Sequence, residues 1–170
     1  MNLYHSCIPQ MTNTLRQART WLDKAQAFAE QKKIDPEVLL GSRLAPDQWA
    51  LWRQLQSFAM ASERVGAMLT GAAPPQQEMK QENLAELRAR LDRTLEALQA
   101  LKPEQFEGAE ERMIGLPFMP GKGMTGSNMV LQFALPNFYF HASMAYAILR
   151  HNGVELGKID FLGQLDIRDI

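Results

Sequence analysis

The stretch that decides the fold is PNFYFHASMAYAILRHNGV, residues 136–154. Its initial proline and its closing Asn-Gly pair predict a helix over residues 136–151. Within that helix, Asn137 and His141 stand four residues apart, so they share one face with apolar side chains. Two histidines at this spacing can hold a metal ion, but here an asparagine replaces the first. The stretch therefore reads as a metal-site helix that lacks a ligand, or as the wall of a helical core.

The composition is that of a soluble globular protein. Of the 170 residues, 46% are hydrophobic and 22% charged, and 18 Lys and Arg nearly balance 19 Asp and Glu, for a formal net charge of -1. Such a balance provides no field to attract nucleic acid or an anionic membrane, so we expect neither partner. No run of about 18 apolar residues predicts a membrane span.

The cysteine content and the N-terminal segment bear on the expected location. Cys7 is the single cysteine, so no disulfide can form within the chain, and a reducing compartment fits best. The N-terminal segment lacks the basic region followed by an apolar run that marks a secretory signal. We therefore expect a cytoplasmic protein.

Three further segments carry apolar residues at helical spacing. The first runs from about residue 8 to 35, and the second from about residue 46 to 70, with Pro46 and Asp47 in its first turn. The third runs from about residue 79 to 101. By contrast, residues 113–135 are rich in Gly and Pro without a helical period, which predicts short strands or a hairpin around PGKGMTG.

Four amphipathic helices bury their apolar stripes best as a four-helix bundle. We therefore predict an all-α protein with one domain over residues 1–170 and a short β-hairpin or irregular insert before the last long helix. The long connections after the first and third helices allow a topology other than up-down-up-down. The tail is expected to pack back on the body through its apolar residues, which are Leu156, Ile159, Phe161 and Leu162.

The candidate ligand pocket is centred on His141. An inward histidine in a bundle can be a ligand, or it can be a neutral residue hydrogen-bonded to a neighbouring helix. Gln56, one turn from Trp52 at the margin of an apolar stripe, could face Asn137 and His141 across the bundle. Amide oxygens are weak ligands for zinc or nickel but good hydrogen-bonding groups. We therefore expect no metal or other cofactor, take His141 as the ligand if any metal binds, and name the pocket residues as Gln56, Asn137, His141 and Trp52.

Several other residues have simpler explanations. His151 is placed to cap the last helix, and Cys7 lacks the basic setting that a reactive thiolate requires. The segment PGKGMTGS lacks the residue order of a phosphate-binding loop and reads as a turn. Three tryptophans are expected to be core or interface anchors rather than a ligand cage, because aromatic side chains at helical spacing are ordinary packing groups; they are Trp21, Trp49 and Trp52.

Two stretches of the chain resemble a known family. LDKAQAF…KKIDPEVLLGSRLAPDQWALWRQLQSF and LPNFYFHASMAYAILRHNGVELGKIDFLG are similar to a bacterial and fungal family of unknown function within the DinB/YfiT-like four-helix bundles. The resemblance implies a DinB-like topology and a homodimer, and it implies no established activity. Many DinB-like proteins hold a divalent metal with three histidines. The corresponding positions here are Gln56, Asn137 and His141, so one ligand of three is present.

Three hypotheses follow. The leading one is a bundle without metal that binds a small molecule in the former metal pocket. The alternative is a divalent-metal-dependent thiol transferase or hydrolase that uses His141 with ligands not identified, for which His5, His151 or Glu63 are candidates. The third is a purely dimeric interaction module without a pocket.

Overall fold

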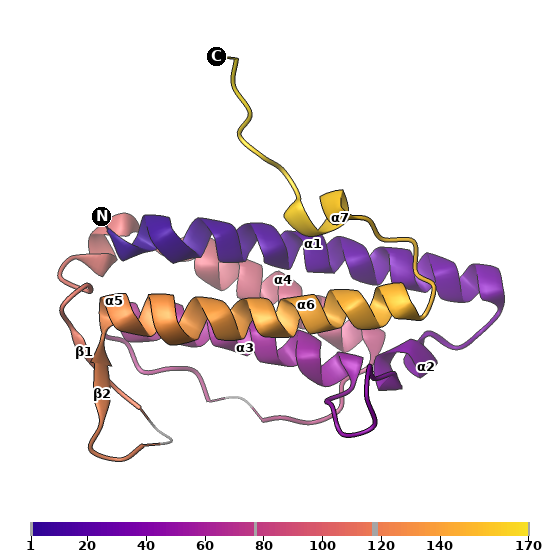
Figure 1. The fold of residues 1–170 in the computed structure, drawn as a ribbon, viewed down its shortest axis with the longest axis horizontal. Helices are drawn as coiled ribbons and strands as arrows, with labels where there is room; N and C mark the ends of the chain where they lie inside the picture. The colour runs from indigo at the N-terminus through magenta and orange to yellow at the C-terminus, as the bar shows by residue number, and fades with distance from the viewer. Residues whose placement is uncertain (1, 77, 117–118, 170) are drawn as a thin grey trace.

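The fold is a bundle of long helices, seen in a computed structural model that describes residues 2–76, 78–116 and 119–169. The bundle consists of α1 (Leu3–Lys32), α3 (Leu51–Thr70), α4 (Leu84–Ala100) and α6 (Leu135–His151) (Figure 1). The short helical elements are α2 (Pro36–Gly41), η1 (Pro103–Phe106), α5 (Gly126–Asn128), η2 (Met129–Ala134) and α7 (Lys158–Leu162). The predicted all-α bundle is confirmed.

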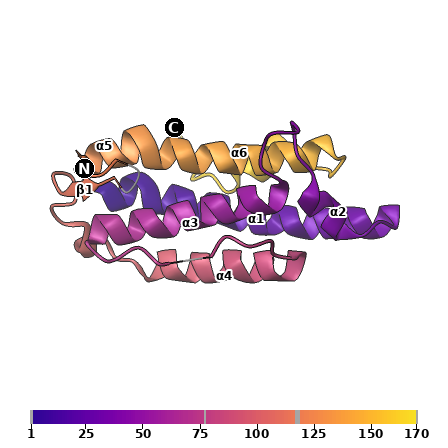
Figure 2. The same cartoon turned by 90° about the horizontal axis from the view of Figure 1, so that it is seen from below.

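The helices do not alternate in direction along the chain. α1 and α6 run one way, and α3 and α4 both run the other way (Figures 1 and 2). The connection between α3 and α4, residues 71–83, therefore returns along the length of the bundle before α4 begins. This returning connection passes beside α3 and becomes part of the walls of both cavities described below.

Two helices start later than their apolar periodicity predicts, one at a capping box and the other after a turn. α4 begins at Leu84 because Asn83 accepts the backbone N–H of Glu86 and Glu86 accepts that of Asn83, which is a capping box. α3 begins at Leu51 rather than near residue 46. Residues 44–48 form bends and a turn instead, so Trp49 lies outside the helix.

The last helical run begins ten residues before Pro136, contrary to the prediction. It starts with α5, continues through the π-helix η2, and passes into α6 without a break in helical backbone. In η2 the backbone N–H of Leu135 bonds the carbonyl of Val130, five residues back. The wider π turn gives room for the ring of Pro136, which would meet the carbonyl four residues back in a regular helix.

The predicted insert is a two-stranded antiparallel hairpin. β1 (Met113–Gly115) pairs with β2 (Gly123–Thr125), with Ile114 opposite Met124. Residues 117 and 118 of the predicted insert lie outside the described residues. Directly after β2, Gly126 packs so closely that an added Cβ would lie 1.9 Å from the carbonyl oxygen of Ala109, so no larger residue fits without moving the backbone.

The tail returns to the body, as predicted, through fewer residues than expected. Phe161 of α7 stacks on the buried ring of Trp21, whose indole N–H donates to the carbonyl of Asp160 at 2.8 Å. Leu156 is buried, but Ile159 is 72% exposed. The contact between α7 and α1 therefore combines this aromatic stack with hydrogen bonds from Trp21 and Asn13 to α7 carbonyls and the ion pair of Lys24 with Asp160.

Candidate functional site

A long groove lies between α3 and α6. It encloses a cavity of about 820 Å³, and its walls come from α3, from η2 and the start of α6, from the returning connection and from the hairpin. Four methionines line it, at positions 60, 68, 79 and 129, together with Phe133 and the ring of Trp49. Its polar side chains include Asn137, His141, Arg53 and Arg64. We refer to this cavity as the groove.

His141 sits in the groove wall as a neutral imidazole. The residue is 8% exposed, and burial lowers its pKa from 6.5 to about 4. Its Nδ1 lies 2.7 Å from Oε1 of Gln54, and the Nε2 of the same amide donates to the carbonyl of Trp49. Since Oε1 can only accept, Nδ1 carries the proton and the other ring nitrogen, Nε2, carries a lone pair.

Trp49 supports the imidazole from outside the helix. The two rings are parallel to within 2° with centroids 5.5 Å apart. The guanidinium of Arg53 lies over the same indole, with Cζ 4.0 Å from the ring centroid. Trp49 is 40% exposed, so it is a rim residue of the groove, and of its two predicted roles, core anchor or interface anchor, the core role does not hold.

The structure brings Asn137 and His141 together in the groove but places Gln56 elsewhere. Gln56 is fully buried, and its Nε2 donates to the carbonyl of Lys80 in the returning connection at 2.7 Å. Gln54 holds the position facing His141. The feature of the sequence that could have identified Gln54 is its position on the apolar stripe of α3, three residues after Leu51 and four before Phe58.

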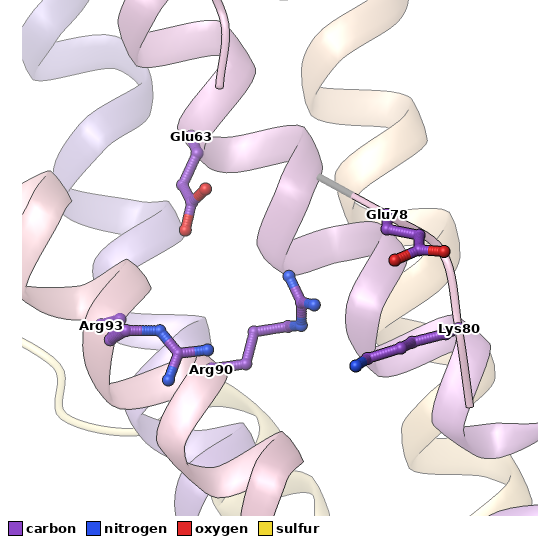
Figure 3. A pocket seen from close by; sticks show the side chains of 5 residues that line it. All are labelled: Glu63, Glu78, Lys80, Arg90 and Arg93. Atoms are coloured by element: carbon purple, nitrogen blue, oxygen red, sulfur yellow. The ribbon is translucent and has the colours of Figure 1, made fainter. Parts of the chain in front are cut away.

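A second, polar cavity of about 290 Å³ lies on the other side of the returning connection. Figure 3 shows the side chains that line it, which come from α3, α4 and the connection and are Glu63, Glu78, Lys80, Arg90 and Arg93. Glu63 accepts a hydrogen bond from Thr94. The lining side chains carry three positive and two negative charges, and the nearby carboxylate of Glu82 supplies the third negative charge. This cavity therefore has no uncompensated charge to attract an ion.

Glu82 and Arg90 form a buried ion pair beside the polar cavity. The guanidinium donates from Nε at 2.8 Å and from an Nη at 2.5 Å to the two carboxylate oxygens, and the side chains are 7% and 10% exposed. By itself burial raises the pKa of Glu82, but hydrogen bonds from Arg90 and Gln56 and the charges of Arg90 and Arg93 outweigh it and lower the pKa. This pair fixes the returning connection to α4.

The residues around His141 do not fit a divalent metal site. The partner of Nδ1 is an amide, and the side chain one turn earlier, Asn137, is another. Within the described part of the chain, no three His, Cys, Asp or Glu side chains gather where they could hold a metal ion. A zinc site built by protein normally needs three strong nitrogen, sulfur or charged oxygen ligands, and this groove offers one imidazole with neutral amides.

The remaining candidates lie away from the groove. Trp52 is half-buried against the core and does not line the cavity. His5 and His151 are exposed, and neither contributes to the groove. Burial raises the pKa of the Cys7 thiol to about 12, so this residue stays a neutral packing group near pH 7.

The chain is similar to a family of unknown function and to a solved structure. The sequence model of a family described as a domain of unknown function (DUF1993) matches residues 3–162. The crystal structure of a DinB family member protein from Shewanella denitrificans is similar, with 41% sequence identity, a TM-score of 0.92, and coverage of 99% of this chain and 96% of that chain. No curated protein matches. Among the described helices, none has the length and apolar character of a membrane span.

Proposed function

The chain belongs to the DinB-like family of unknown function DUF1993, and from that premise we propose that it binds a small, mainly apolar molecule in the groove between α3 and α6. The observation that carries the proposal is the cavity itself. Its volume of about 820 Å³ and its apolar walls with a few convergent polar groups are typical of small-molecule sites.

Under this proposal the groove works without a resident metal, and the family's metal position is degenerate. The amide of Gln54 fixes the tautomer of His141, and the lone pair on Nε2 is left to accept a hydrogen bond from a ligand. Asn137, one turn away on the same helix, can donate and accept. We place the protein in the cytoplasm because its single cysteine is a buried, free thiol.

Nile red, a neutral dye that fluoresces in apolar surroundings, tests the proposal. We expect saturable binding at about one dye per chain, and loss of binding when Ala61→Trp fills the groove wall. Ala97→Trp, on the exposed face of α4, is the matched control and should bind as the wild type does.

Two results would contradict the proposal: no saturable binding, or equal binding by Ala61→Trp and the wild type. Metal analysis of the same protein, purified without an affinity tag, tests the metal-free part. One tightly held divalent ion per chain would show that part to be wrong.

We also propose a homodimer. Three aromatic side chains in or beside the groove remain well exposed: Trp49 at 40% and Phe133 at 39% in its walls, and Phe140 at 52%, whose ring meets that of His141 edge to face. A second copy could cover them, and a stable interface buries about 800 Å² on each partner. Size-exclusion chromatography with light scattering should give twice the chain mass of 19.2 kDa. A monomer at high protein concentration would rule the dimer out.

A further inference from the structure

The groove contains positive charge that no carboxylate neutralises. Arg53 and Arg64 line it, and none of the described residues in its walls is an Asp or Glu. Among the described residues, Arg53 makes no ion pair, and its Nε is enclosed without a hydrogen-bond partner. His141 adds no charge because burial keeps its imidazole neutral. A half-buried guanidinium without a carboxylate is costly, so a bound anion would be favourable here.

The guanidinium of Arg53 lies over the ring of Trp49. The Cζ atom is 4.0 Å from the indole centroid, well within the distance at which a guanidinium makes a cation–π contact with an aromatic ring. This contact involves the face of the guanidinium, and because its Nε is enclosed, the Nη groups at its outer edge are the ones that an anion can reach. Those N–H groups can bind the two oxygens of a carboxylate at once.

The rest of the groove suits an elongated apolar body. The lining residues of α3 run from Arg53 to Met68, a length of about 22 Å at the rise of an α-helix. The four methionines of the wall have flexible, unbranched side chains that can adapt to a chain or ring of varied shape. The half-buried arginine, Arg53, is at one end of this row, because it is the first residue of α3 to line it, whereas Arg64, further along the row, is exposed.

We propose that the ligand is an amphipathic carboxylate, a molecule with one carboxylate and an elongated apolar body such as a fatty acid, with its carboxylate on Arg53 and its body along the methionines. This inference rests on the proposed ligand-binding function and adds the chemical class of the ligand. The polar cavity is a poorer candidate for an anion, since carboxylates already balance its cations.

A matched pair of fluorescent probes, cis-parinaric acid and its methyl ester, tests the inference, because the two have the same chain and only the acid is charged. We expect the wild-type protein to bind the acid about tenfold more tightly than the ester. Arg53→Gln should lower affinity for the acid about tenfold and leave affinity for the ester unchanged, because a hydrogen bond to a charged group is lost. Arg53→Lys keeps the positive charge but loses the planar pair of N–H donors, so its affinity for the acid should lie between that of the wild type and that of Arg53→Gln.

Arg16→Gln, at an exposed position of α1 outside the groove, is the matched control and should bind both probes as the wild type does. Thermal unfolding of each variant verifies that it is folded. Equal affinity for acid and ester, or a larger loss from Arg64→Gln than from Arg53→Gln, would overturn the role of Arg53. If Nile red binds and neither fatty probe does, the ligand class is wrong; if Nile red also fails to bind, the proposed function itself is wrong.

Discussion

Arg90→Met is expected to lower the free energy of unfolding by about 3–5 kcal/mol, because it leaves a buried carboxylate without its partner. Glu82 is 6% exposed and accepts two hydrogen bonds from Arg90. Methionine fills much of the space of arginine but donates no hydrogen bond. Urea unfolding followed by circular dichroism, at one protein concentration, measures the change.

The pH dependence of this difference identifies its cause. In the wild-type protein the pKa of Glu82 is lowered, so its stabilisation is fully present above the ordinary carboxyl pKa and is lost as pH falls through the folded-state value. In Arg90→Met, burial remains without Arg90, so we expect the pKa of Glu82 to be raised. Protonation then removes the penalty as pH falls. The gap between the two proteins should be largest near pH 7 and should shrink below about pH 4.

Arg93→Met is the matched control, since Arg93 is exposed on the same helix and lines the same polar cavity (Figure 3). We expect it to change the free energy of unfolding by less than about 0.5 kcal/mol. If Arg90→Met is equally mild, or if its effect is independent of pH, the ion pair does not stabilise the fold as described. Because the pair fixes the connection that contributes Met79 to the groove, Arg90→Met should also weaken Nile red binding.

Phe138→Ala is expected to destabilise the protein by about 3–5 kcal/mol, the range measured for removing a buried aromatic side chain. Phe138 is 0% exposed in the face of α6 that packs on α3. Its ring meets that of Phe58 edge to face, with centroids 5.6 Å apart and planes at 88°. The substitution leaves a cavity at the contact between the two helices that form the groove. Urea unfolding at fixed protein concentration measures the loss.

Ile159→Ala serves as the control for Phe138→Ala, because it removes a large apolar side chain that is 72% exposed on α7. Its cost should stay below about 0.5 kcal/mol. A cost of less than about 1 kcal/mol for Phe138→Ala would mean that the α3–α6 contact repacks and is not a fixed wall of the groove.

The positions and types of the long helices followed from periodicity, and their ends were less well determined. Both Leu84 and Leu51 start helices about five residues later than predicted, since caps and turns outweigh apolar spacing at a helix end. The start of the last helix was missed for a different reason. Pro136 looked like a first-turn proline, but a π-helix makes room for it inside a longer helical run.

The sequence by itself determined the helical bundle and the placement of Asn137 and His141 on one face of a helix. Both depend only on the spacing of residues along single helices. Which side chain faces them was decided only by the tertiary structure. α3 is in contact with helices on several sides, so Gln54 and Gln56 are both buried, yet they face different neighbours. The guanidinium of Arg53 over Trp49 likewise depends on a turn outside α3, which no helical period describes. The spacing of residues along a helix determines which side chains share a face, and only the packing of the helices determines which neighbouring residues those side chains contact.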